Sequence, residues 1–185
     1  KLKYTLEIIE NDNSKIGVNT HSANKIILHA LKNNLIDELK AFSEIRPETK
    51  FGSNTRFDFL VLKKRDRAFV EVKNVTLSRK KEIAEFPDAI TTRGLKHIKE
   101  LVKASKKNYK IFILYLIQRD DCKFFTIAKD IDPAYSAALT KAVKKKLNIL
   151  CYDCKFSSKG IKLNNKINFK KKWIIILKKR LKRQN

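Results

Sequence analysis

The sequence predicts an α/β fold in which a mixed sheet is flanked by helices. Helix and strand patterns alternate along the chain, in the order helix, β-hairpin, helix, strand, helix, strand. Residues 111–117 are nearly all apolar, which is typical of a central strand buried on both faces. With 185 residues and 43% hydrophobic residues, the chain can bury the core of one domain without disulfides.

The N-terminal part predicts a hairpin followed by a helix. Residues 3–10 are rich in Ile, Leu, Tyr and Thr, residues 11–14 form a polar turn, and residues 15–19 return as the second strand. Ser22 or Asn24 can cap a helix, which then ends at Asn33-Asn34. Its apolar positions recur at helical spacing and are Ile26, Ile27, Ala30 and Leu31.

The middle of the chain predicts a second hairpin and a second helix. Residues 56–62 and 68–74 are the two strands, and a polar turn joins them. We expect a loop over residues 78–90, and then a helix capped by Thr91 or Thr92. The apolar stripe of that helix consists of Leu95, Ile98, Leu101 and Val102.

After the buried strand at residues 111–117, Asp132-Pro133 predicts another helix start, because proline is favoured at the first helical position. Residues 148–152 indicate a further buried strand. Lys and Arg dominate residues 170–185, where we expect a phosphate-binding tail. Within it, residues 173–177 are apolar but too few for a membrane anchor, and the sequence holds no run of 18 apolar residues.

The charge of the chain points to a polyanionic partner. Forty-three Lys and Arg oppose nineteen Asp and Glu, for a net charge of +24. Such self-repulsion is tolerated when the partner is DNA or RNA, because cation–phosphate contacts release condensed counterions. An anionic membrane surface is one alternative. Compositional drift is another, since the chain is also crowded with Asn and Ile.

Three cysteines are too few for a disulfide framework. Cys151 and Cys154 form a CxxC pair, but the three histidines are distant in sequence and supply no second ligand pair for zinc. Reduced thiols in a cytoplasmic protein are the expectation that fits this pattern best.

A compact acidic and basic cluster lies on the central hairpin. Strand side chains alternate between faces, so Glu71 and Lys73 share one face, and Asp58 can reach the same place from the neighbouring strand. Two carboxylates can hold a hard cation such as Mg²⁺, with water and phosphate oxygens completing its coordination. A lysine beside the cation can orient water or stabilise developing charge. The alternative is a solvent-facing strand in which Glu-x-Lys occurs by chance in a lysine-rich chain.

A second cluster begins the second helix. Arg93 and His97 are four residues apart and share a helix face, with Lys96 beside them. Arg93 near a helix start can bind phosphate together with free backbone N–H groups. A solvated basic helix face explains the same pattern equally well.

Together, these motifs resemble the sugar fermentation stimulation protein family (SfsA). The resemblance rests on TRFDF at residues 55–59, EVKNVTL at 71–77 and FPDAITTRG at 86–94, with His97 following. Shorter matches are QRD at 118–120, Phe125, and IDP at 131–133, and the similarity covers about residues 1–165.

The resemblance implies a DNA-binding protein linked to sugar (maltose) metabolism in bacteria, with a larger domain similar to the PD-(D/E)XK nucleases. It implies Asp58 and Glu71 as ligands of Mg²⁺ (or Mn²⁺), Lys73 as the catalytic lysine and Gln118 as an auxiliary polar group. Two residues of the matched motifs, Arg56 and Arg119, join Arg93, Lys96 and His97 as candidate nucleic-acid contacts.

The family also has a smaller OB-like domain before the nuclease-like domain. We expect most of it to be missing here, with residues 1–10 as its end, residues 11–169 as the nuclease-like α/β domain and residues 170–185 as the basic tail. Nucleases of this class often carry an acidic residue on the first helix, whereas residues 24–30 contain no carboxylate. A weaker metal site is the expected consequence.

Two functions therefore compete. One is a metal-dependent DNA nuclease, and the other is a DNA-binding regulator whose nuclease-like fold is catalytically silent. A sugar-responsive protein is a third class, but the sequence shows no sugar site.

Overall fold

The computed structural model describes residues 3–11 and 14–170. Helices and strands alternate along this part of the chain as the sequence predicts. The helices are α1 (Ser22–Lys32), α2 (Thr92–Ser105) and α3 (Pro133–Val143). The strands are β1 (Ile8–Asn11), β2 (Ser14–Gly17), β3 (Glu44–Phe51), β4 (Thr55–Lys63), β5 (Asp66–Val75), β6 (Leu77–Lys80), β7 (Ile83–Phe86), β8 (Lys110–Ile117), β9 (Phe124–Ile127), β10 (Leu147–Ser157), β11 (Gly160–Lys166) and β12 (Asn168–Phe169).

A six-stranded mixed sheet forms the centre of the molecule, with the strand order β11-β10-β8-β5-β4-β3. The strands β10, β8 and β5 run parallel, and the remaining neighbours are antiparallel. The predicted mixture of parallel and antiparallel pairing is thus confirmed. The almost wholly apolar β8 occupies an interior position of this sheet and is buried on both faces.

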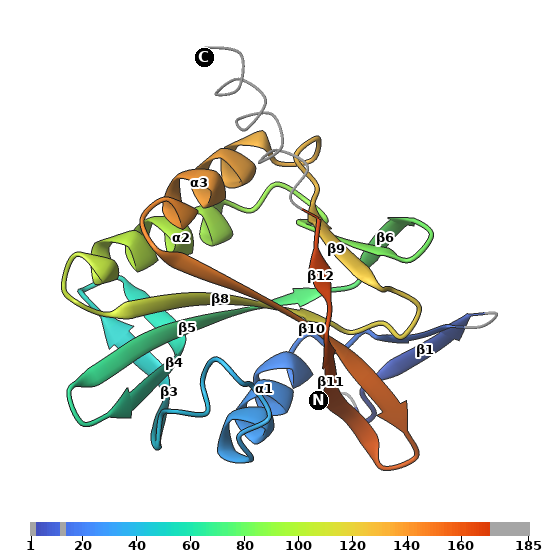
Figure 1. Cartoon of the computed structure of the whole chain (residues 1–185). Helices are drawn as coiled ribbons and strands as arrows, with labels where there is room; N and C mark the ends of the chain where they lie inside the picture. The colour runs from blue at the N-terminus through green and yellow to red at the C-terminus, as the bar shows by residue number, and fades with distance from the viewer. Residues whose placement is uncertain (1–2, 12–13, 171–185) are drawn as a thin grey trace, which may run out of the picture.

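Helices cover both faces of this sheet. Figure 1 shows α1 on one side and the pair α2 and α3 on the other. Two hydrophobic clusters correspond to these two faces. Alternating residues of β5 divide between them, with Val70 and Val72 in the cluster beneath α1, and Phe69 and Val75 in the cluster beneath α2 and α3.

The helix caps agree with the sequence in two of three cases. Thr91 accepts a hydrogen bond from the Gly94 N–H at the start of α2, and Asp132 accepts one from the Tyr135 N–H at the start of α3. The predicted cap of α1 is wrong, because His21 precedes the helix and makes no capping bond with its side chain.

The predicted loop over residues 78–90 is also wrong in its first half. The strands β6 and β7 pair there and join β9 and β12 in a small second sheet, seen beside the main sheet in Figure 1. The strand β3 had no counterpart in the sequence analysis. It contains Pro47 and many charged residues, which an edge strand tolerates because one side of its backbone is unpaired.

The N-terminal hairpin is confirmed as an antiparallel pair of β1 and β2, although residues 12–13 of its turn lie outside the described residues. It attaches to the chain just after β8, where the Gly17 N–H donates to the Gln118 carbonyl at 2.9 Å and the Lys15 N–H to Asp120 at 2.8 Å. The hairpin crosses the domain boundary expected at residue 10, and that division stays a prediction. The basic tail at residues 171–185, including the apolar residues 173–177, lies outside the described part of the chain.

Within residues 3–11 and 14–170, no helix has both the length and the apolar character needed to cross a membrane.

Candidate active site

The hairpin of β4 and β5 brings together the three residues of the predicted acidic and basic cluster. Its register pairs Phe59 with Val70 and then ends, so the two strands separate next to Asp58 and Glu71. Glu71 and Lys73 lie on the same face of β5, as predicted, and their side chains are in contact, with Lys73 Nζ 2.6 Å from Glu71 Oε1.

Asp58 bridges the gap where the two strands separate. Its Oδ2 atom accepts a hydrogen bond from the backbone N–H of Val72 at 2.7 Å, in place of a main-chain partner from β4. Its Oδ1 atom accepts from the side-chain amide of Asn24 at 2.8 Å. The carboxylate is therefore held by β5 and by the first turn of α1 together.

Glu71 is buried, with 2% of its surface exposed, and its two oxygens differ in their surroundings. Oε1 accepts from Lys73 and from the ring of His97, whose Nδ1 atom is in close contact with it. Oε2 is buried and has no hydrogen-bond partner. Such an atom lowers the stability of the folded protein, because burial removes the water that would donate to it and no other donor takes its place. A bound cation would supply the partner that Oε2 lacks.

The two carboxylates differ in their pKa shifts. Burial and the nearby charge of Glu71 raise the pKa of Asp58, against the opposing effect of the N–H groups of Val72 and Asn24. Burial alone would raise the pKa of Glu71 as well, but the bonds from His97 and the charge of Lys73 outweigh it and lower that pKa. Glu71 is thus an anion at neutral pH. A cation bound beside it would also favour the negatively charged form of Asp58.

The predicted nucleic-acid contacts separate into exposed and buried groups. Arg56, Arg93 and Lys96 are exposed, and Lys96 donates to the Asn54 carbonyl at 2.7 Å. Arg119 is partly buried, and its guanidinium is bonded to Asp121 and to the Thr76 carbonyl.

His97 is also among the predicted nucleic-acid contacts, but it is 7% exposed and faces Glu71. The structure thus brings His97 into the carboxylate cluster.

Gln118 is fully buried, and its contacts lie with other polar side chains. Its amide donates to Asn74 at 2.6 Å, and its carbonyl oxygen accepts from Ser22 at 3.2 Å. It joins the end of β5 to the start of α1, the two elements that hold Asp58. A positioning role fits this location better than direct contact with the carboxylates, although the assignment of Gln118 stays a prediction.

Sequence reasoning missed two links of the cluster. Asn24 was considered only as a helix cap, and His97 only as a phosphate contact. The available signal for Asn24 was its place in the first turn of the helix on which nucleases of this class carry an acid. For His97, no local signal exists, because 26 residues separate it from Glu71.

The CxxC pair does not form a metal site. Three residues apart on β10, Cys151 and Cys154 point to opposite faces, and each is buried in a different hydrophobic cluster. Across the described ranges, no three His, Cys, Asp or Glu side chains are grouped as metal ligands. A cation at Asp58 and Glu71 would therefore need water or phosphate oxygens to complete its coordination.

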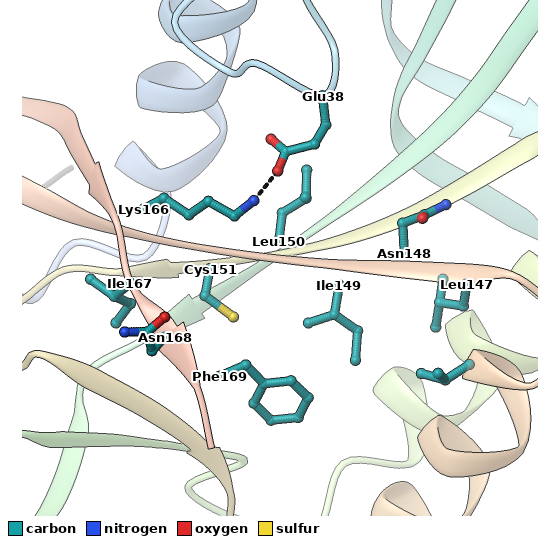
Figure 2. A pocket seen from close by; sticks show the side chains of 11 residues that line it. Glu38, Leu147, Asn148, Ile149, Leu150, Cys151, Lys166, Ile167, Asn168 and Phe169 are labelled. Carbon is teal, nitrogen blue, oxygen red and sulfur yellow. Dashed lines mark hydrogen bonds and ion pairs between the residues drawn. The ribbon is translucent and has the colours of Figure 1, made fainter. Parts of the chain in front are cut away.

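A cavity of about 540 Å³ opens beside β10, away from the predicted site residues. In Figure 2, the ion pair of Glu38 with Lys166 lies on one side of the strand, and Leu147, Ile149 and Phe169 lie on the other. Its one carboxylate is already paired with a lysine, so this cavity offers no comparable pair of anionic ligands.

Comparison with known proteins identifies relatives of this arrangement. A family model described as "Sugar fermentation stimulation protein RE domain" matches residues 21–160. The sugar fermentation stimulation protein homolog of Pelagibacter ubique is 53% identical over 167 residues, which are 90% of this chain and 72% of that protein. The homolog of Bartonella quintana is 41% identical over 165 residues, 87% of this chain and 69% of that protein.

A solved structure gives the same result for the fold. SfsA of Pyrococcus furiosus, in complex with Ca²⁺, superposes with a TM-score of 0.84 at 25% identity, and covers 92% of this chain and 73% of that one.

Proposed function

This chain belongs to the sugar fermentation stimulation protein family, and from that premise we propose that it binds DNA and hydrolyses phosphodiester bonds with a divalent cation held by Asp58 and Glu71. The observation that carries the proposal is the buried Glu71 Oε2 atom, which has no hydrogen-bond partner. The Ca²⁺ complex of Pyrococcus furiosus SfsA supports a hard-cation site in this fold. The cation we propose for activity is Mg²⁺, with Mn²⁺ as its substitute.

The arrangement of the sheet supports a nuclease core of the PD-(D/E)XK type. Adjacent strands carry Asp58 on β4 and Glu71 with Lys73 on β5, and helices cover both faces. When bound, Mg²⁺ neutralises phosphate charge and lowers the pKa of its water. The chain itself orients Asp58 through Val72 and Asn24, and keeps Lys73 beside Glu71, from which its ammonium can reach a phosphate oxygen.

The exposed cations near this cluster are the proposed DNA contacts. Arg93 lies in the first turn of α2, and Lys96 and His97 follow on the same helix. His97 of the same helix contacts Glu71, so α2 lies against the carboxylate cluster, and Arg93 and Lys96 are exposed on this helix. Arg56 on β4 adds a cation two residues from Asp58.

Cleavage of labelled DNA with Mg²⁺, Mn²⁺ or EDTA tests the proposal. We expect cleavage that needs the metal and is lost in Asp58→Ala and Lys73→Met, while Asp37→Ala, an exposed carboxylate elsewhere, behaves as wild type. Binding measured in Ca²⁺ should weaken steeply with salt, because each neutralised phosphate releases counterions. A flat salt dependence contradicts the DNA-binding half of the proposal.

The second candidate is a non-catalytic DNA-binding regulator of sugar (maltose) metabolism on the same fold. It is favoured by Asn24, because an amide and not a third carboxylate contacts Asp58 from α1. DNA that is bound but stays intact with both Mg²⁺ and Mn²⁺ would select this candidate.

We also propose a cytoplasmic location. The three cysteines are buried thiols, as expected where thiols are kept reduced.

A further inference from the structure

The buried histidine of α2 is the part of the cluster that the proposed chemistry does not yet use. His97 enters from a helix on one face of the sheet and places Nδ1 against Glu71 Oε1. Because a carboxylate only accepts hydrogen bonds, the Nδ1 atom carries the hydrogen of this contact. The ring also packs edge-on against Phe57, with 6.3 Å between ring centroids. Both contacts fix its orientation.

Glu71 Oε1 accepts hydrogen bonds from Lys73 and His97, and in the proposed function only Lys73 must also contact the phosphate of the substrate. Lys73 Nζ lies 2.6 Å from this oxygen, so an ammonium that turns to a phosphate must lengthen or break that bond. A buried carboxylate that loses its donors is strongly destabilised. His97 lies on a different element from Lys73, so its contact with Oε1 does not depend on where the Lys73 side chain points.

We propose that His97 is a positioning residue that holds Glu71 Oε1, directs the free Oε2 atom to the cation, and lets Lys73 leave Glu71 for the phosphate of the substrate. This inference rests on the proposed function, since it assigns a role within the same site. It differs from the phosphate contact expected from the sequence, because His97 is buried and acts through Glu71.

A purely structural histidine would fill the same space without affecting the cation. The two roles differ in what a replacement must supply. An orienting residue needs an N–H donor at the position of Nδ1, whereas a space-filling residue needs only volume. Asparagine retains a side-chain donor, and leucine retains apolar volume without any donor.

The test measures Ca²⁺ binding by calorimetry in wild type, His97→Asn and His97→Leu. Loss of a hydrogen-bond partner of a metal ligand typically costs about 10- to 100-fold in metal affinity, and we expect that loss in His97→Leu. His97→Asn should recover most of the affinity. His29→Ala is the matched control, because His29 is an exposed histidine on α1, and it should bind Ca²⁺ as wild type does. Equal affinity in folded His97→Leu and wild type overturns the inference and leaves the proposed function intact.

A measurement on the unmodified protein covers the case in which a variant does not fold. In ¹⁵N spectra of histidine-labelled wild type, we expect the protonated His97 Nδ1 signal to shift as Ca²⁺ is added and to keep its hydrogen. A signal unmoved at saturating Ca²⁺ overturns the inference. If wild type binds no Ca²⁺, Mg²⁺ or Mn²⁺ at all, the proposed cation site itself fails, and the role of His97 fails with it.

Discussion

Replacing Asn24 by aspartate should turn a stabilising contact into a repulsive one. In wild type, the Asn24 amide donates to Asp58 Oδ1 at 2.8 Å. Asn24→Asp removes this donor and places a second carboxylate beside the first. The change is informative because it puts on α1 the acidic group that nucleases of this class often carry there.

The expected magnitude follows from two effects. A hydrogen bond to a charged group contributes about 1.5–3 kcal/mol. Two carboxylates about 4 Å apart repel by about 4 kcal/mol at an effective dielectric of about 20, and solvent at this half-buried position reduces that to roughly 1–2 kcal/mol. An acid in the first turn of α1 gains only about 0.3–1 kcal/mol from the helix dipole, so repulsion dominates.

Asn24→Asp should therefore lose about 1.5–4.7 kcal/mol of unfolding free energy, and its Tm should fall by roughly 3–19 °C for a chain of this size. The assay is thermal unfolding at pH 8 with EDTA, repeated with Ca²⁺. Cation at about 100 times its Kd adds about 2.7 kcal/mol to any species that binds it only when folded. We expect Ca²⁺ to raise the Tm of Asn24→Asp more than that of wild type, because a third carboxylate joins the site.

Two control variants separate the causes. Asn24→Ala removes the bond without adding charge and should lose only the part due to the hydrogen bond. Asn54→Asp adds the same charge at an exposed position in the turn before β4, and surface substitutions of this kind usually change stability by about 0.5 kcal/mol or less. A wild-type Tm for Asn24→Asp in EDTA would refute the contact between α1 and Asp58.

Three further predictions concern other parts of the fold. Gly17→Ala would place a Cβ atom 2.5 Å from Oε1 of the buried Gln118, and overpacking of this kind costs about 1–3 kcal/mol, which equilibrium denaturation in urea measures. Arg79→Met removes the guanidinium that lowers the pKa of Glu85, so it should reduce the Tm at pH 7. The stability that a lowered carboxyl pKa provides is lost as the pH falls through the pKa of the folded state. The difference in Tm between Arg79→Met and wild type should therefore vanish in acid. Burial raises the pKa of the Cys122 thiol to about 11, so at pH 8 it should react with iodoacetamide roughly 100-fold more slowly than an ordinary thiol.

Each of these has an outcome that contradicts it. A Gly17→Ala protein as stable as wild type would mean that Gln118 can move without cost. A Tm difference for Arg79→Met that persists unchanged at pH 3 would mean that the arginine acts through packing instead of charge. Rapid alkylation of Cys122 in the folded protein, mapped by mass spectrometry of peptides, would show that the thiol is accessible.

The sequence predicted correctly those features that depend on residues close together in the chain. The alternation of β5 placed Glu71 and Lys73 on one face, and the contact between them confirms it. The caps Thr91 and Asp132 were also readable, because a capping side chain bonds to N–H groups only three residues away. Charged or proline-containing strands such as β3 were not readable, because edge strands need no apolar alternation.

The sequence by itself thus determined an α/β chain, a strongly basic composition and the residues Asp58, Glu71 and Lys73 on one hairpin. Only the tertiary structure decided what surrounds them. It brought Asn24 from one face of the sheet and His97 from the other, and it moved Gln118 away to Asn74 and Ser22. The physical reason is that these contacts join residues far apart in the chain, so they follow from how helices pack on a sheet and leave no periodic trace in the sequence.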